Sequence, residues 1–318
     1  MITRERLFLL SLENAIFLEK YKGNFKLMNL NFKIKTFVLI CLIFLGVFSR
    51  YYSQTPDKAG FKTGADRPEI YLPLLKNKTI GIVTNQTGLL KDKTHLVDFL
   101  VRNNVKIKTI FAPEHGFRGN ADAGEKVKNG VDVKTGIPIV SLYGNNKKPK
   151  SEQLKELDIV VFDIQDVGVR FYTYISTLTY LMEAGAENNV EIMVLDRPNP
   201  HDGYIDGPVL KKKWTSFVGM HEVPVVYGLT IGEYGKMVNG EKWLKNGVQA
   251  RYTLIEMQDY HKKKRYSILD KPSPNLPDDK SINLYPSLCF FEGTQVSVGR
   301  GTDLPFQIYG SPWTTSLP

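Results

Sequence analysis

From about residue 66 onward, short apolar runs alternate with longer amphipathic stretches. The apolar runs are rich in β-branched and aromatic residues, which favours β-strands. These runs are Thr79–Thr84, Ile107–Ala112, Ile137–Leu142, Asp158–Asp163 and Glu191–Asp196. The stretches between them predict helices over Lys93–Asn103, Ser151–Leu157 and Tyr174–Asn188, the last with Ser/Thr residues suited to capping at its start. Because parallel strands need long crossovers, this alternation predicts a Rossmann-like α/β domain with a parallel sheet covered on both faces.

The rhythm changes after about Gly203, where Pro-rich segments, a predicted helix over Ile231–Asn246 and the loop Asp270–Pro277 follow. We therefore divide the chain into three parts. Residues 1–64 form a leader, and residues 65–205 form the Rossmann-like domain. Residues 206–318 are expected to extend that domain and to begin a smaller α+β auxiliary domain.

The leader contains a twelve-residue apolar or small run, Phe37–Phe48, preceded by two lysines. This run is too short for a membrane span and is typical of the central region of a secretory signal. A start at Met28 would place it conventionally, with the signal peptide over about 28–53 and a linker after it. We therefore interpret residues 1–27 as a misassigned start and expect an exported, periplasmic protein. The alternative is an uncleaved N-terminal anchor, which would attach the protein to a membrane.

The formal net charge of +9 does not indicate nucleic-acid binding. Residues 1–54 hold 8 Lys/Arg against 3 Glu, whereas the remaining chain holds 34 Lys/Arg against 30 Asp/Glu. Such a mixed balance is typical of a solvated surface rather than of a stripe that follows phosphates. Two cysteines, Cys41 and Cys289, are too few for a disulfide framework or a cysteine-based zinc site.

Several cofactor and catalytic motifs are absent from the sequence. The first predicted strand is followed by Asn-Gln-Thr-Gly without a GxGxxG pattern, and no GxxxxGK(S/T) phosphate loop occurs. There is no HExxH, and Asp163, Asp166 and His115 lack a diagnostic metal-ligand spacing. No GxSxG elbow occurs either, which argues against a serine hydrolase. We expect neither a nucleotide cofactor nor a metal.

Polar residues follow the predicted strands at the positions where open parallel sheets bind ligands, beyond the carboxyl ends of the strands. Four polar ends are Asn85–Gly88, Pro113–Gly119, Asp163–Tyr172 and Asp196–Pro200. Ordinary turns also contain Gly, Pro, Asn and Asp, and the aspartates that end two strands equally suit helix caps. The density of ionisable groups after the second and fourth strands favours a functional cleft. Asn85, Asp196 and Arg197 are further candidates for substrate contact.

Glu114 is the strongest candidate for a general acid. It lies beside His115, with Phe111 and Phe117 nearby, so that loss of hydration would raise its pKa, as acid catalysis at neutral pH requires. The alternative is a glutamate paired with His115 or Arg118, and the sequence does not decide between the two.

A second polar group follows the fourth strand and comprises Asp163, Gln165, Asp166, Arg170 and Tyr172. It offers hydrogen bonds to sugar hydroxyls, a second carboxylate, and in Arg170 a cation for a carboxylate-bearing substrate. The alternative is an internal Asp–Arg pair that braces the loop.

Five motifs in this order resemble those of the exo-β-N-acetylmuramidase family of peptidoglycan hexosaminidases, the NamZ-type enzymes. They are Thr84-Asn-Gln-Thr-Gly88, Ala112-Pro-Glu-His-Gly-Phe-Arg-Gly119, Phe162-Asp-Ile-Gln-Asp-Val-Gly-Val-Arg-Phe-Tyr-Thr-Tyr174, Leu195-Asp-Arg-Pro-Asn-Pro200 and Gly299-Arg-Gly-Thr-Asp303. The likeness runs from about Pro68 to Trp313. Members usually continue well beyond the segment that matches Gly310–Trp313, so the auxiliary domain is expected to be incomplete.

The resemblance implies a Rossmann-like domain that carries the active site, followed by a smaller auxiliary domain. It also implies release of N-acetylmuramic acid (MurNAc) from the non-reducing end of peptidoglycan-derived MurNAc-GlcNAc chains. By motif position, the catalytic glutamate of the family falls on Glu114. Its polar cleft residues fall on His115, Asp163, Gln165, Asp166, Arg170 and Tyr172. Our hypothesis is that Glu114 protonates the glycosidic oxygen and that Asp163 or Asp166 is the second catalytic carboxylate. The alternative function is non-catalytic binding of cell-wall sugars.

Overall fold

The structure, a computed structural model, describes residues 61–114, 116–118, 129–262, 264, 266–268 and 270–313. These residues belong to one compact unit, Pro56–Pro318. Its strands are β1 (Thr79–Thr84), β2 (Lys106–Ala112), β3 (Gly130–Val131), β4 (Pro138–Ser141), β5 (Ile159–Asp163), β6 (Glu191–Leu195) and β7 (Tyr252–Ile255). Its α-helices are α2 (Pro68–Leu75), α3 (Leu96–Arg102), α4 (Ser151–Leu154), α5 (Tyr174–Asn188), α6 (Ile231–Gly240) and α7 (Asp279–Leu288). Short 3-10 helices cover Gly64–Asp66, Lys212–Trp214, Lys245–Gly247 and Cys289–Gly293.

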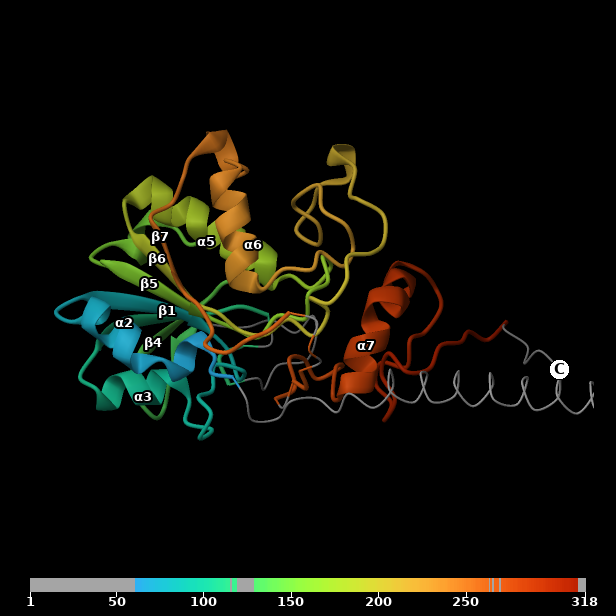
Figure 1. Ribbon diagram of the computed structural model, residues 1–318, viewed down its shortest axis with the longest axis horizontal. Coiled ribbons are helices and arrows are strands. Elements are labelled where there is room, and N and C mark those ends of the chain that lie inside the picture. The colour runs from blue at the N-terminus through green and yellow to red at the C-terminus, as the bar shows by residue number, and fades with distance from the viewer. Residues whose placement is uncertain are drawn as a thin grey trace, which may run out of the picture. The chain divides into compact units, whose positions relative to one another are not determined.

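The strands form a 7-stranded sheet in the order β3-β4-β2-β1-β5-β6-β7. Neighbouring strands are parallel except for β3 and β4, which pair in the antiparallel direction. Helices α2 and α3 cover one face of the sheet, and α5 and α6 cover the other (Figure 1). The predicted Rossmann-like α/β fold, with helices on both faces of a mostly parallel sheet, is confirmed.

Alternation along the strands divides the core into two layers, because successive side chains point to opposite faces of a sheet. In β1, Ile80 and Ile82 pack with α2 and α3, whereas Val83 packs with α5. In β5, Val161 joins the first layer and Val160 joins the second. Each such buried aliphatic side chain contributes roughly 1.5–3 kcal/mol relative to exposure, which makes this register hard to shift.

Three predicted helices are shorter than expected. The first begins only at Leu96, as α3, because the N-cap residue His95 has extended backbone, with φ −67° and ψ 136°. The other two end early, next to a residue in the left-handed region. Glu156, with φ 66°, follows the end of α4. Lys242, with φ 56°, lies just beyond α6, which ends at Gly240 rather than at residue 246.

Several elements were not predicted. Internal prolines obscured two helices, because proline inside a helix removes a backbone hydrogen bond: α2 contains Pro73 and α7 contains Pro286. The edge strand β7 pairs with β6, and α6 packs against α5, so that this part of the chain extends the sheet and its helical cover. The linker predicted up to residue 64 is too long, because Lys62 N–H donates to the Gln258 carbonyl oxygen at 2.9 Å.

The predicted signal segment over about 28–53 lies outside the described residues. Within the residues that the structure describes, no helix combines the length and apolar character that crossing a membrane requires.

Candidate active site

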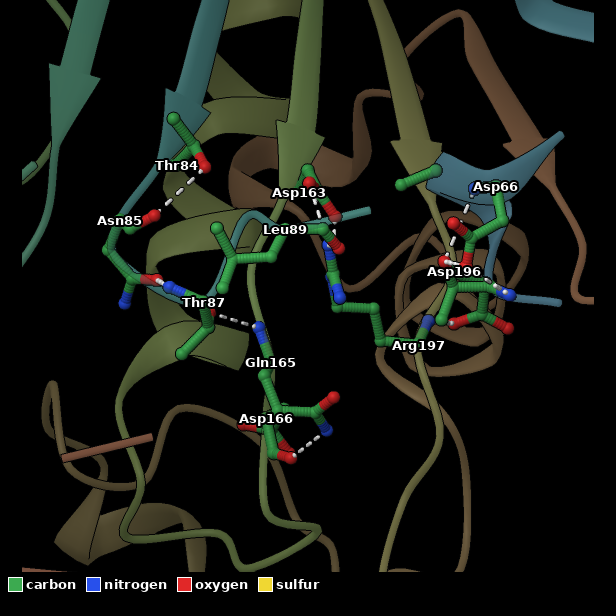
Figure 2. Close-up of polar contacts among 12 residues, drawn as sticks. Asp66, Thr84, Asn85, Thr87, Leu89, Asp163, Gln165, Asp166, Asp196 and Arg197 are labelled. Atoms are coloured by element: carbon green, nitrogen blue, oxygen red, sulfur yellow. Dashed lines mark hydrogen bonds and ion pairs between the residues drawn. The ribbon is translucent and has the colours of Figure 1, made fainter. Parts of the chain in front are cut away.

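The carboxyl ends of β1, β5 and β6 meet at one edge of the sheet, and Figure 2 shows the polar contacts there. Asp163, the last residue of β5, is fully buried. Arg197 donates to both of its oxygens, with Nε–Oδ1 at 2.6 Å and Nη2–Oδ2 at 2.9 Å. Arg197 Nη2 also donates to the Leu89 carbonyl oxygen at 3.0 Å. This bidentate pair therefore connects the segments that follow β1, β5 and β6.

Asn85 and Gln165 join the same loops through side-chain hydrogen bonds (Figure 2). Asn85 Oδ1 accepts from the Thr87 hydroxyl at 2.6 Å, and Thr87 Oγ1 accepts from the Gln165 backbone N–H at 3.0 Å. Gln165 Nε2 donates to the carbonyl oxygens of Asp166 and Pro198, at 2.7 Å and 2.6 Å. Asn85 Oδ1 and Gln165 Nε2 thus hold the neighbouring loops, whereas Asn85 Nδ2 donates to the Tyr174 hydroxyl at 2.8 Å.

Two buried aspartates have raised pKa values. Burial raises the pKa of Asp166 to about 6, although hydrogen bonds from the Tyr227 hydroxyl and the Gly168 N–H favour its charged form. Burial also raises the pKa of Asp196 to about 7, against hydrogen bonds from its neighbours, among them the Thr230 hydroxyl at 2.7 Å. Thr230 is the N-cap residue of α6, so Asp196 anchors the start of that helix to the sheet.

Arg170, predicted to face a substrate carboxylate, is turned towards the backbone. Its Nη1 donates to the Pro208 carbonyl oxygen at 2.9 Å and to the Val223 carbonyl oxygen. The guanidinium is buried and braces the segment between these two residues. The predicted alternative, an internal Asp–Arg pair, exists in the loop cluster, but it joins Asp163 to Arg197 rather than to Arg170.

Glu114 follows β2 and lines a cavity of about 290 Å³. Its half-buried carboxyl accepts hydrogen bonds from the Tyr143 hydroxyl at 3.2 Å and from the Thr173 hydroxyl at 3.4 Å. Thr173 is the N-cap residue of α5, yet its side chain makes no capping hydrogen bond, which corrects the prediction of side-chain capping there. Arg118, the predicted alternative partner, pairs with Asp132 at 2.9 Å instead. The Glu114 carboxyl is therefore oriented by two neutral hydroxyls.

Two charged residues in this cavity, Glu292 and Arg300, were not predicted. Arg300 Nη1 lies 3.2 Å from Glu292 Oε1. Burial raises the pKa of Glu292, the Arg300 guanidinium opposes this shift, and the Glu114 carboxylate adds to it. Arg300 lies in the fifth motif of the family resemblance, so its position in that motif could have indicated a role in the site. Glu292 lies in a 3-10 helix and carried no such signal.

Aromatic and apolar side chains complete the wall of the cavity. Tyr172 lines it, and its hydroxyl donates to the Pro272 carbonyl oxygen at 2.7 Å. The Tyr285 ring packs edge-on against Tyr172 and Phe306, with centroid separations of 6.0 Å and 5.0 Å. A cavity with apolar walls and a few convergent polar groups suits a small organic ligand.

The predicted site residues therefore separate into three groups. Glu114 and Tyr172 line the cavity of about 290 Å³, whereas Gln165 and Arg197 line one of about 130 Å³. Asn85, Asp163, Asp166, Arg170 and Asp196 line neither and make the bracing contacts described above. His115 lies outside the described residues. Across the described ranges, no three His, Cys, Asp or Glu side chains cluster as metal binding requires.

Two family descriptions match the chain. Residues 80–280 match "Exo-beta-N-acetylmuramidase NamZ, N-terminal", and residues 283–317 match "Exo-beta-N-acetylmuramidase NamZ, C-terminal". The chain is 44% identical over 272 residues to the peptidoglycan beta-N-acetylmuramidase NamZ of Bacillus subtilis (strain 168). The alignment covers 83% of this chain and 64% of that protein, so the chain spans less than two thirds of the length of this relative.

Two DUF1343 family proteins from Bacteroides fragilis NCTC 9343, known from crystal structures, are similar in sequence and fold. The first is 47% identical with a TM-score of 0.75, and the match covers 82% of this chain and 69% of the other. The second is 36% identical with a TM-score of 0.73, and the match covers 80% and 66% respectively.

Proposed function

The chain belongs to the exo-β-N-acetylmuramidase NamZ family, and we propose on that basis that it is a glycoside hydrolase acting on N-acetylmuramic acid glycosides of peptidoglycan. More specifically, we propose that the protein releases MurNAc from the non-reducing end of MurNAc-GlcNAc chains and needs no cofactor. It is carried by one observation. Glu114, at the carboxyl end of β2, presents its carboxyl to a cavity large enough for a sugar ring.

In this mechanism Glu114 is the general acid that protonates the glycosidic oxygen as the bond to the sugar breaks. The Tyr143 and Thr173 hydroxyls hold its carboxyl in one orientation, which preserves the geometry for proton transfer. Glu292 shares the cavity and takes the role of second carboxylate that we had expected of Asp163 or Asp166. It would stabilise the positive charge that develops on the sugar or activate the attacking water.

The test is the E114Q variant, assayed on a chromogenic MurNAc glycoside. We expect turnover to fall by roughly 10²–10⁴-fold, the usual contribution of a general acid, with the melting temperature unchanged. E241Q is the matched control, since Glu241 is exposed at the end of α6, and it should retain full activity. Wild-type turnover by E114Q would remove Glu114 from this role. Binding of MurNAc by the wild-type protein without any turnover would favour the alternative, a wall-sugar-binding protein.

We also propose that the protein is exported. This is supported by the apolar run Phe37–Phe48 and the basic residues before it. Expression of the full chain, cell fractionation and N-terminal sequencing of the recovered protein test this proposal. Recovery in the cytoplasm with an intact N-terminus would contradict it.

A further inference from the structure

Arg300 is the one basic side chain among the described residues that line the Glu114 cavity. It lies in a turn between Gly299 and Gly301, which have φ values of 75° and 81°. A Cβ atom on Gly299 would lie 2.6 Å from the Leu304 carbonyl oxygen, so only glycine fits there without a backbone shift. This turn holds the backbone of Arg300 in place while its side chain stays 43% exposed.

The contact with Glu292 orients the Arg300 guanidinium but uses one of its three nitrogens. It joins Nη1 to Glu292 Oε1 at 3.2 Å. A guanidinium carries five N–H donors in a planar fork, so one such bond leaves an edge that can bind a carboxylate through two parallel hydrogen bonds. Lysine could not replace this geometry, because its ammonium group is a point charge.

An anionic ligand can bind in this cavity only if a positive charge offsets the carboxylates that line it. Glu114 and Glu292 both line the cavity and would repel a carboxylate that enters it. Arg300 is the group there that can offset this repulsion. Arg170, the cation that the sequence suggested, donates to backbone carbonyl oxygens and does not line the cavity.

We propose that Arg300, oriented by Glu292, binds the ether-linked lactyl carboxylate of the substrate sugar and determines its specificity. This carboxylate distinguishes N-acetylmuramic acid from N-acetylglucosamine, whose ring carries a hydroxyl at the same carbon. The inference rests on the proposed function for the identity of the sugar. Arg300 is thus a specificity-determining residue in the cavity that Glu114 also lines.

The test compares R300Q, R300K and the wild-type protein on paired chromogenic glycosides of MurNAc and GlcNAc, and measures the affinity of free MurNAc and GlcNAc by calorimetry. R102Q is the control for loss of an arginine, because Arg102 is exposed at the end of α3. A charge-assisted hydrogen bond at a partly exposed site corresponds to about 10- to 30-fold in affinity. We therefore expect R300Q to lose about 10- to 30-fold in kcat/KM and in affinity for MurNAc. Its values for GlcNAc should stay within about threefold of the wild-type values.

R300K should fall between R300Q and the wild-type protein, because it keeps the charge but loses the planar fork. Equal losses on both sugars, or a MurNAc preference unchanged in R300Q, would overturn the inference while leaving the proposed function intact. A wild-type protein that prefers MurNAc in calorimetry but turns over neither glycoside would refute the proposed function. The loss of that preference in R300Q would then still support the inference. No MurNAc preference in the wild-type protein would overturn it.

Discussion

Replacing Asp163 by asparagine tests whether this carboxylate holds the sheet edge together or takes part in catalysis. Asp163 is fully buried, and the Arg197 side chain is 7% exposed. The substitution keeps the shape of the side chain but leaves a buried guanidinium without its counter-charge. Removing one partner of a buried ion pair typically costs about 3–5 kcal/mol of the free energy of unfolding. That is a large part of the roughly 5–15 kcal/mol that stabilises a typical domain.

Urea unfolding of D163N, followed by tryptophan fluorescence, measures this loss as a lower midpoint with an unchanged slope. The double variant D163N/R197M removes the unpaired charge as well, so it should recover part of the loss. Recovery should be incomplete, because the Leu89 carbonyl oxygen also loses its hydrogen bond from Arg197. Activity per folded molecule should stay close to that of the wild-type protein. Wild-type stability combined with abolished turnover would refute this reasoning and return Asp163 to the catalytic machinery.

Two further predictions concern the carboxyls at the same edge of the sheet. Y143F removes the hydroxyl that donates to Glu114 at 3.2 Å, and it should lower kcat by roughly three- to tenfold without changing the melting temperature. Y309F, at an exposed tyrosine, is its control, and equal kcat values for the two variants would contradict the orienting role. Burial raises the pKa of Asp196 to about 7, so the folded protein binds this proton more tightly than the unfolded chain, whose value is about 3.9. The wild-type protein should therefore lose stability through this group as the pH rises from about 4 to about 7. Urea unfolding of D196N and of the wild-type protein between pH 5 and pH 8 measures this effect. The free energy of unfolding of D196N minus that of the wild-type protein should increase with pH. A difference that stays constant would show that Asp196 is not protonated more readily in the folded state.

The sequence alone was sufficient to predict the alternation of strands and helices, because side-chain period and crossover length are local properties. The carboxyl ends of the strands then indicated where polar groups would gather, and Glu114 became the candidate general acid in this way. Local pattern was least informative where proline obscured α2 and α7, and where residues in the left-handed region ended helices early.

Only the tertiary structure decided which charged groups meet. Asp163 pairs with Arg197, 34 positions away along the chain, and not with the nearer Arg170. Glu292 and Arg300 reach the cavity of Glu114 from the C-terminal part of the chain. The physical reason is that the direction of a strand determines only the edge of the sheet at which its last residues lie. The path of each loop and the burial of each side chain then determine its partner.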